Sequence, residues 1–220
     1  MTILLHIFAK TSDIMKKHTL FAILLLIPAL LSAKDKDDFG IWSSVSSSFR
    51  ISDRWKVGLM TEHRSLDNTR GLDCALVMPS FEYRPCKFIK TGFASEYVMC
   101  GDKTTQLTAR PYVTLSVSSG PLTVSLRELP IGEYTFETKE MTWTSRTMFK
   151  AAYTIEKLGM QPYLASETFI REGWQKTRNY VGTEISFGRH SYADIYYMYY
   201  IMAGKTYQRH VLGIGYGISF

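Results

Sequence analysis

The chain has 220 residues, a length that corresponds to one large domain or two small ones. Charged residues make up 21% of it, too many for a bundle of transmembrane helices, and 14% aromatic residues exclude a disordered chain. The net charge of +6 comes from basic residues spread singly along the chain, so we expect no nucleic-acid partner. Two classes remain, a soluble β-rich domain and a β-barrel that spans a lipid bilayer.

The first segment has the pattern of a cleavable secretory signal. Lys16 and Lys17 precede an apolar run from Leu20 to Leu31, and Ala33 offers a small residue at a cleavage site. The run is shorter than the ~20 residues that a transmembrane helix needs. We therefore predict an N-terminal extension and signal peptide at 1–33, with the signal proper at 15–33, and a single exported domain at 34–220.

Beyond the signal, short segments of period-two alternation are separated by turn residues, which predicts an antiparallel sandwich or barrel. The longer polar connections fall at 66–73, 99–105, 130–141, 171–176 and 202–206. Eleven candidate strands are expected at Phe39–Arg50, Trp55–Ser65, Cys74–Arg84, Phe88–Val98, Gln106–Val117, Leu122–Leu129, Thr142–Tyr153, Gln161–Ile170, Thr177–Phe187, Tyr192–Ile201 and Tyr207–Phe220.

The final strand favours the membrane class. Every second side chain up to the carboxyl terminus is apolar, and glycines fill most of the positions between: the apolar set is Leu212, Ile214, Tyr216, Ile218 and Phe220. This pattern resembles the C-terminal signal that the barrel-assembly machinery recognises in outer-membrane proteins. We therefore predict an all-β, antiparallel up-and-down transmembrane barrel in the outer membrane, with membrane lipid as its partner.

Several short motifs in a fixed order resemble one family. They are Asp38-Phe39-Gly40-Ile41-Trp42, Trp55-Lys56-Val57-Gly58-Leu59, Glu62-His63-Arg64, Leu126-Arg127, the segment from Pro162 to Phe169, Arg178-Asn179-Tyr180 and the segment from His210 to Tyr216. The set is similar to an uncharacterised outer-membrane barrel family, "domain of unknown function 2490", of Bacteroidetes-type bacteria. The resemblance implies an outer-membrane barrel and brings no activity, cofactor or catalytic residue with it.

If the apolar stripes face lipid, the opposite stripes place charged side chains in the lumen. The main expected lumen charges are Glu62, Arg64, Glu96, Arg110, Arg127, Arg146, Glu167, Arg178, Glu184 and Asp194, with Glu82, Arg84, Lys90 and Lys150 beside them. One interpretation is a set of ion pairs that fills the bore and fixes strand register. The other is a narrow polar channel whose charges set selectivity.

Three cysteines occur, without the spacing of a metal or haem site, so we expect neither a metal nor a cofactor. Cys74 begins one strand and Cys100 follows the next, so a hairpin brings them to the same rim. Either they form a disulfide, with Cys86 free at the opposite rim, or all three are free thiols. The tryptophans Trp42, Trp55, Trp143 and Trp174 are expected in interfacial aromatic girdles.

A lipid-modifying enzyme is the alternative function, because barrels of this size include outer-membrane lipases and deacylases. The one adjacent His/Ser pair, His190 and Ser191, lies in a tight turn, and no serine motif accompanies His63 or His210. We therefore expect a non-catalytic structural barrel or narrow channel. A third interpretation, a soluble periplasmic barrel around an apolar ligand, requires Leu115, Ile185 and Leu212 to face inward.

The number of candidate strands conflicts with the even strand number of known bacterial barrels. Single-chain bacterial barrels have an even number of strands, with both chain ends at the periplasmic side. The eleven candidates conflict with that rule, so we expect ten or twelve strands within a range of 10–12.

Overall fold

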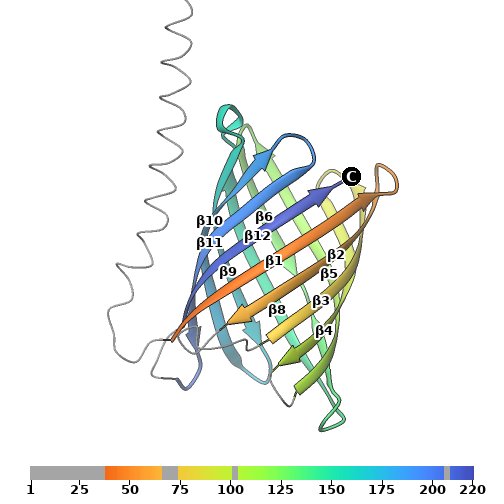
Figure 1. Cartoon of the computed structure of the whole chain (residues 1–220), viewed down its shortest axis with the longest axis vertical. Coiled ribbons are helices and arrows are strands. Elements are labelled where there is room, and N and C mark those ends of the chain that lie inside the picture. Colours follow the sequence, from red (N-terminus) through yellow and green to blue (C-terminus); the bar gives the residue numbers. More distant parts are fainter. Residues whose placement is uncertain (1–37, 66–73, 101–103, 206–208) are drawn as a thin grey trace, which may run out of the picture.

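The computed structural model describes residues 38–65, 74–100, 104–205 and 209–220. Within these residues the chain forms one β-sheet that closes on itself as a barrel (Figure 1). The segment predicted to be a signal, 15–33, lies outside the described residues. No helix of the described part is long and apolar enough to cross a membrane.

Twelve strand segments of the described chain build the sheet. They are β1 (Asp38–Arg50), β2 (Trp55–Ser65), β3 (Cys74–Cys86), β4 (Ile89–Cys100), β5 (Thr104–Ser119), β6 (Leu122–Glu128), β7 (Ile131–Thr135), β8 (Glu140–Tyr153), β9 (Met160–Ile170), β10 (Trp174–Phe187), β11 (Ser191–Met202) and β12 (Arg209–Ser219), with a short 3₁₀ turn, η2 (Glu156–Leu158), before β9.

The segments β6 and β7 occupy one position in the barrel. Both pair with β5 and with β8, and the register of β6 continues into β7 without a shift. The interruption falls at Leu129 and Pro130, and Pro111 of β5 lies opposite Pro130 by the same register. Because a proline has no N–H to give to the ladder, the pairing is lost here while the strand continues. The polar loop expected over 130–141 is therefore wrong in its first half.

With β6 and β7 counted once, the barrel has eleven strands. Each hairpin reverses the chain direction, so an odd number leaves the first and last strands pointing the same way. They close the barrel as a parallel pair, from Asp38 opposite Arg209 to Ser48 opposite Ser219. The range of 10–12 strands is confirmed, but the even number was the wrong expectation. An odd count is known among membrane barrels from the mitochondrial channel.

The two rims of the barrel differ in their connections. At one rim, called the disulfide end, the side chains of Cys74 and Cys100 form a disulfide between the register partners of β3 and β4. At the other rim, called the turn end, the short turns and Phe220 lie together (Figure 1). Cys86 is a free, exposed cysteine at the turn end. This is the first of the two arrangements that the sequence left open.

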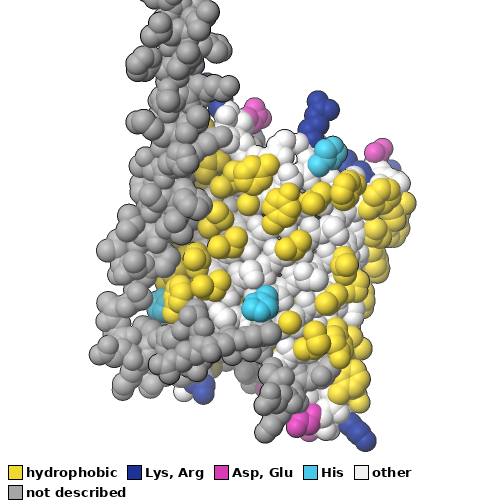
Figure 2. Space-filling model, in the orientation of Figure 1, with side chains coloured by type: hydrophobic (Ala, Val, Ile, Leu, Met, Phe, Trp, Pro, Cys, Tyr) yellow, Lys and Arg dark blue, Asp and Glu magenta, His cyan; other side chains and the backbone are white. Residues whose placement is uncertain are grey.

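The alternation of the sequence separates the two faces of the sheet. On β2, Lys56, Met60 and Glu62 face the bore, whereas Val57 and Leu59 face outward and are exposed. The same alternation puts the buried core inside the barrel and large apolar side chains outside it. Figure 2 shows apolar side chains across the middle of the visible wall, and charged side chains gathered near the two rims.

Candidate functional site

The inner wall carries the ten main charged residues that the sequence placed in the lumen, whereas Arg84 and Lys90 are largely exposed near the turn end. Nine of the ten main residues form ion pairs across or along the inner wall. Their partners come from different strands, except that Glu62 and Arg64 both lie on β2. The tenth, Asp194 on β11, accepts hydrogen bonds from the Tyr163 hydroxyl at 3.0 and 3.2 Å. Charges that face inward are thus satisfied mainly by one another, as burial requires.

Glu167 is the centre of the largest ion-pair group. Its side chain is fully buried on β9, and one oxygen accepts a hydrogen bond from Arg146 and lies 3.5 Å from Arg127. The other oxygen lies 3.6 Å from Arg178 and accepts a 2.9 Å hydrogen bond from the Tyr180 hydroxyl. One carboxylate therefore faces three guanidinium groups, so this group carries an excess of positive charge.

A second group surrounds Glu96 on β4, which is also buried. Arg110 pairs with one of its oxygens, and Arg64 lies 3.8 Å from the other while binding Glu62 at 2.6 Å. The Arg64 guanidinium also stacks 4.3 Å from the centre of the Trp42 ring. Trp42 is buried in the bore, which corrects its expected place in an outer aromatic girdle.

Toward the turn end, tyrosine rings fill the bore. Tyr196 lies across its register partner Gly213, and a Cβ at Gly213 would overlap the Tyr196 ring. Tyr163 lies in the same way across Gly182. Only a residue without a side chain admits a ring this close to the sheet. The inward-facing glycines between the outward apolar residues therefore leave room for tyrosine rings of the neighbouring strand.

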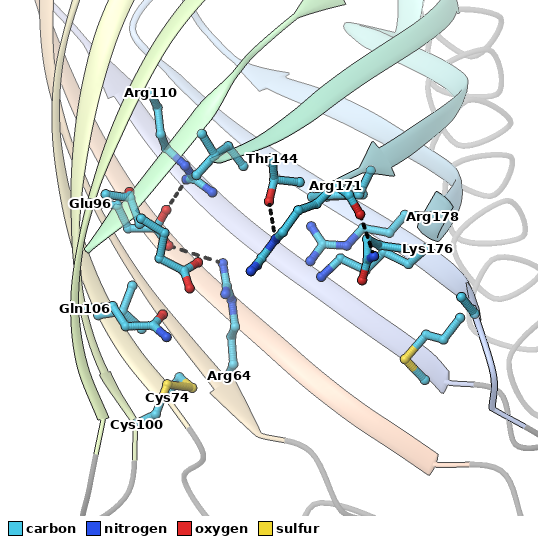
Figure 3. Close-up of a pocket in the computed structure, with 18 of the residues that line it drawn as sticks. Arg64, Cys74, Glu96, Cys100, Gln106, Arg110, Thr144, Arg171, Lys176 and Arg178 are labelled. Atoms are coloured by element: carbon cyan, nitrogen blue, oxygen red, sulfur yellow. Dashed lines mark hydrogen bonds and ion pairs between the residues drawn. A yellow bond between two sulfur atoms is a disulfide. The ribbon is translucent and has the colours of Figure 1, made fainter. Parts of the chain in front are cut away.

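The described residues line two cavities in the bore. The one nearer the disulfide end has a volume of about 460 Å³, and a deeper one has about 300 Å³. Both are lined by Arg64, Arg110 and Arg178, so these three arginines stand between them. Figure 3 shows Arg64, Arg171, Lys176 and Arg178 extending from opposite walls toward the middle of the larger cavity.

The outer wall carries the remaining sequence-predicted residues. On β12, Leu212, Ile214, Tyr216 and Ile218 face outward, and the backbone of Phe220 bonds to Arg50 and Ser48 of β1. The positions required by the soluble-ligand interpretation also face outward, and Leu115 is 48% exposed. Its requirement of an inward apolar stripe is therefore not met.

Among the described residues, no hydrogen bond joins a histidine considered for catalysis to a serine hydroxyl. His190 donates to the backbone oxygen of Ser219 at 2.8 Å, and the Ser191 hydroxyl donates to the backbone oxygen of Phe187 at 2.9 Å. His210 is buried on the outer side of β12, where its Nδ1 is hydrogen-bonded to the Tyr197 hydroxyl. Within the described residues, no group of three or more His, Cys, Asp or Glu side chains is placed to hold a metal ion.

Sequence reasoning missed four charged residues of the larger cavity, the fourth being Lys205 in the connection expected at 202–206. Arg171 and Lys176 fall in a stretch that was expected to be a loop, but β10 begins at Trp174 and Lys176 has the same inward parity as Arg178. Glu133 was missed because β7 was not expected. Extending the alternation of β10 by one more inward position is the signal that finds Lys176.

Comparison with known proteins gives a family without an assigned activity. No curated protein matches the chain. A family model matches residues 39–211, from the first strand into the last. The match covers the motifs on which the resemblance rested, except Asp38 and the part of the last motif from Leu212 to Tyr216. The chain belongs to the family described as "Protein of unknown function (DUF2490)".

Proposed function

We propose that the protein is a small integral barrel of the outer membrane of a Gram-negative cell, exported through the signal at 15–33. The apolar outer wall carries this proposal. Leu164, at the middle of β9, is 64% exposed, and its register partners Val181 and Ala151 are apolar too. Soluble monomers rarely expose a continuous apolar surface of more than a few hundred Å². An outer wall in contact with acyl chains explains this surface.

The closed sheet supports the same proposal. Each strand position has a hydrogen-bonded neighbour on both sides, so the sheet has no free edge. Such closure is what a sheet needs inside a bilayer, where no water can satisfy unpaired backbone groups. Trp55 at the turn end, and Trp143 and Trp174 at the disulfide end, are exposed near the ends of their strands. These positions suit the two aromatic girdles of a membrane barrel.

Within the membrane, the proposed role is structural and non-catalytic, with a bore that is closed to free diffusion. The tyrosines at the turn end and the ion pairs around Glu167 and Glu96 support a closed bore over an open channel. The alternating β12 strand that ends in Phe220 suits recognition by the barrel-assembly machinery. A steady single-channel conductance of the purified protein in a planar bilayer would contradict the closed bore.

The membrane location is tested by charge substitutions on β9. An arginine in place of Leu164 costs about 2–4 kcal/mol of folding stability if this position faces the bilayer midplane. Ile170, at the end of the same strand, is the matched control, and its replacement by arginine costs about 0–1 kcal/mol near an interface. Urea unfolding of both variants in phosphatidylcholine vesicles measures the two costs.

A water-exposed wall predicts a different result. Arginine at an exposed site in water changes stability by about 0.5 kcal/mol or less, so both variants would match the parent protein. Equal stability of Leu164→Arg and Ile170→Arg, together with recovery of the wild-type chain in the soluble fraction, would refute the membrane location.

A further inference from the structure

The larger cavity has more positive charge than its own carboxylates neutralise. Among the described residues, Glu96 and Glu133 line it, and five basic side chains face them: Arg64, Arg110, Arg171, Lys176 and Arg178. Lys205 also lines the cavity but is left out of this balance, because it has an interaction of its own. Glu62 pairs with Arg64 at 2.6 Å, so an excess of two positive charges remains among these residues. Glu167, which does not line the cavity, does not neutralise this excess, because its single carboxylate is shared among Arg127, Arg146 and Arg178.

Two of these cations have no acidic partner in the described chain. Neither Arg171 nor Lys176 forms an ion pair there; the Arg171 Nε donates to the Thr144 hydroxyl at 3.3 Å. The Lys176 ammonium instead lies 4.6 Å from the centre of the Phe169 ring and 5.9 Å from that of Tyr200. Ring faces attract a cation but leave its N–H donors without acceptors.

Buried donors of the same cavity also lack acceptors. The Nε of Arg178, the Nε of Arg110 and the hydroxyl of Thr108 are buried and make no hydrogen bond within the described residues. Arg178 is more than nine-tenths buried, and its side chain extends into the cavity (Figure 3). A buried donor without an acceptor destabilises the fold, because it has lost its hydrogen bonds to water. A ligand that supplies several acceptor oxygens and negative charge would remove these costs together.

We propose that this cavity is a binding site for a multivalent oxyanion, namely a phosphate-bearing group. Guanidinium groups bind phosphate oxygens in pairs, and an ammonium group adds a point charge. The volume of about 460 Å³ lies within the range of small-ligand sites, roughly 300–1,000 Å³. The excess of two charges favours a multivalent anion over chloride. The group arrives either on a soluble phosphate compound or on a lipid headgroup at the rim.

The test is calorimetric titration of the full-length protein, folded in a zwitterionic detergent. One arm uses sodium pyrophosphate, and the other uses detergent micelles that contain phosphatidic acid, with phosphatidylcholine micelles as the blank. The variants are Lys176→Gln and Arg171→Gln. Lys56→Gln is the matched control, because Lys56 is also an inward-facing lysine but lies at the turn end.

Binding in the pyrophosphate arm identifies a soluble ligand, and binding only in the phosphatidic acid arm identifies a lipid headgroup. In either arm, each cavity variant is expected to weaken the Kd about tenfold or more, since each removes a charge-assisted hydrogen bond. The Lys56→Gln variant keeps the wild-type Kd. The thermal midpoints of the ligand-free cavity variants stay equal to or above the wild-type value, which separates lost binding from misfolding.

Absence of binding in both arms overturns the proposal, and so does an equal Kd in all four proteins. Because the titration is done in detergent, it does not depend on where the barrel resides in the cell. A soluble protein that binds pyrophosphate in this way would refute the membrane location and leave the anion site intact.

Discussion

Glu167 offers the sharpest test of how the bore is stabilised. Replacement by glutamine keeps the volume of the side chain and removes its charge, which leaves Arg127, Arg146 and Arg178 facing one another. At the 3.5 and 3.6 Å separations from Arg127 and Arg178, each attraction is about 5 kcal/mol at an effective dielectric constant of ~20. Desolvation of the buried charges offsets much of this gain. Removal of one partner from such a buried group nevertheless costs about 3–5 kcal/mol.

Glu184→Gln is the matched control, because Glu184 also faces the bore and binds a single lysine. Its side chain is 35% exposed and lies 2.8 Å from Lys150, so the loss of this pair costs about 0–1 kcal/mol. Urea unfolding of the folded protein in lipid vesicles gives both free energies of unfolding. We expect Glu167→Gln to be less stable than Glu184→Gln by roughly 3 kcal/mol. Adding Arg146→Gln to the Glu167 variant should recover part of the loss, because it removes one uncompensated charge.

Similar unfolding free energies for Glu167→Gln and Glu184→Gln, within about 1 kcal/mol, would refute this reasoning. That result would mean that water or a mobile counter-ion reaches Glu167 as freely as it reaches Glu184. The side chains around Glu167 would then have no structural role beyond filling space.

Two further predictions concern packing and thiols. Gly213→Ala should cost about 1–3 kcal/mol of folding stability, because its methyl group must displace the ring of Tyr196. Gly215→Ala on the same face is the control and should be near neutral, because its Cβ would closely meet only the Ser44 hydroxyl. Equal urea midpoints for the two variants would contradict the packing argument. Cys86 should be the only cysteine that a maleimide labels in the folded, unreduced protein, because the other two form the disulfide. Mass spectrometry should find one label per chain, rising to three after reduction and unfolding, and two or more labels before reduction would exclude the disulfide.

The sequence predicts the faces of the barrel well, and the reason is local. A strand residue points to the side opposite its neighbours, so the inward positions of Glu62 and Arg64 follow from the outward position of Leu59. The eleven segments were also recognised. The parity rule failed because closure requires only that β1 and β12 bond along their edges, and a parallel pair satisfies those edges as well as an antiparallel one.

Proline explains the error in the middle of the chain. In the sequence, Pro130 indicates the end of a strand, because a proline is rarely found within a central strand. Its opposite neighbour in β5 is Pro111, which has no N–H either, so each proline faces a residue that could not have donated. That compensation belongs to a pair of residues 19 positions apart and is visible only once the register between β5 and β7 is known.

The candidate site was only partly predictable, for a different physical reason. Alternation shows that a side chain faces the bore, but it does not show at which height or beside which partner. Two features depend on the stagger between strands: the convergence of three arginines on Glu167, and the lack of an ion pair for Lys176 with any described carboxylate. The excess of cations at one end therefore could not be separated from the balanced pairs at the other.

The two ends of the bore differ in how far their buried charges are compensated by neighbouring side chains. At the turn end, Lys150 has Glu184, Asp194 has the Tyr163 hydroxyl, and tyrosine rings occupy the remaining space. At the disulfide end, donors outnumber acceptors and a cavity is left among them. Well-packed apolar residues would stabilise a bore as well as ion pairs do, or better. An unbalanced, partly empty cluster is therefore a poor way to stabilise a barrel, and its positive charge is better explained by a ligand that completes it.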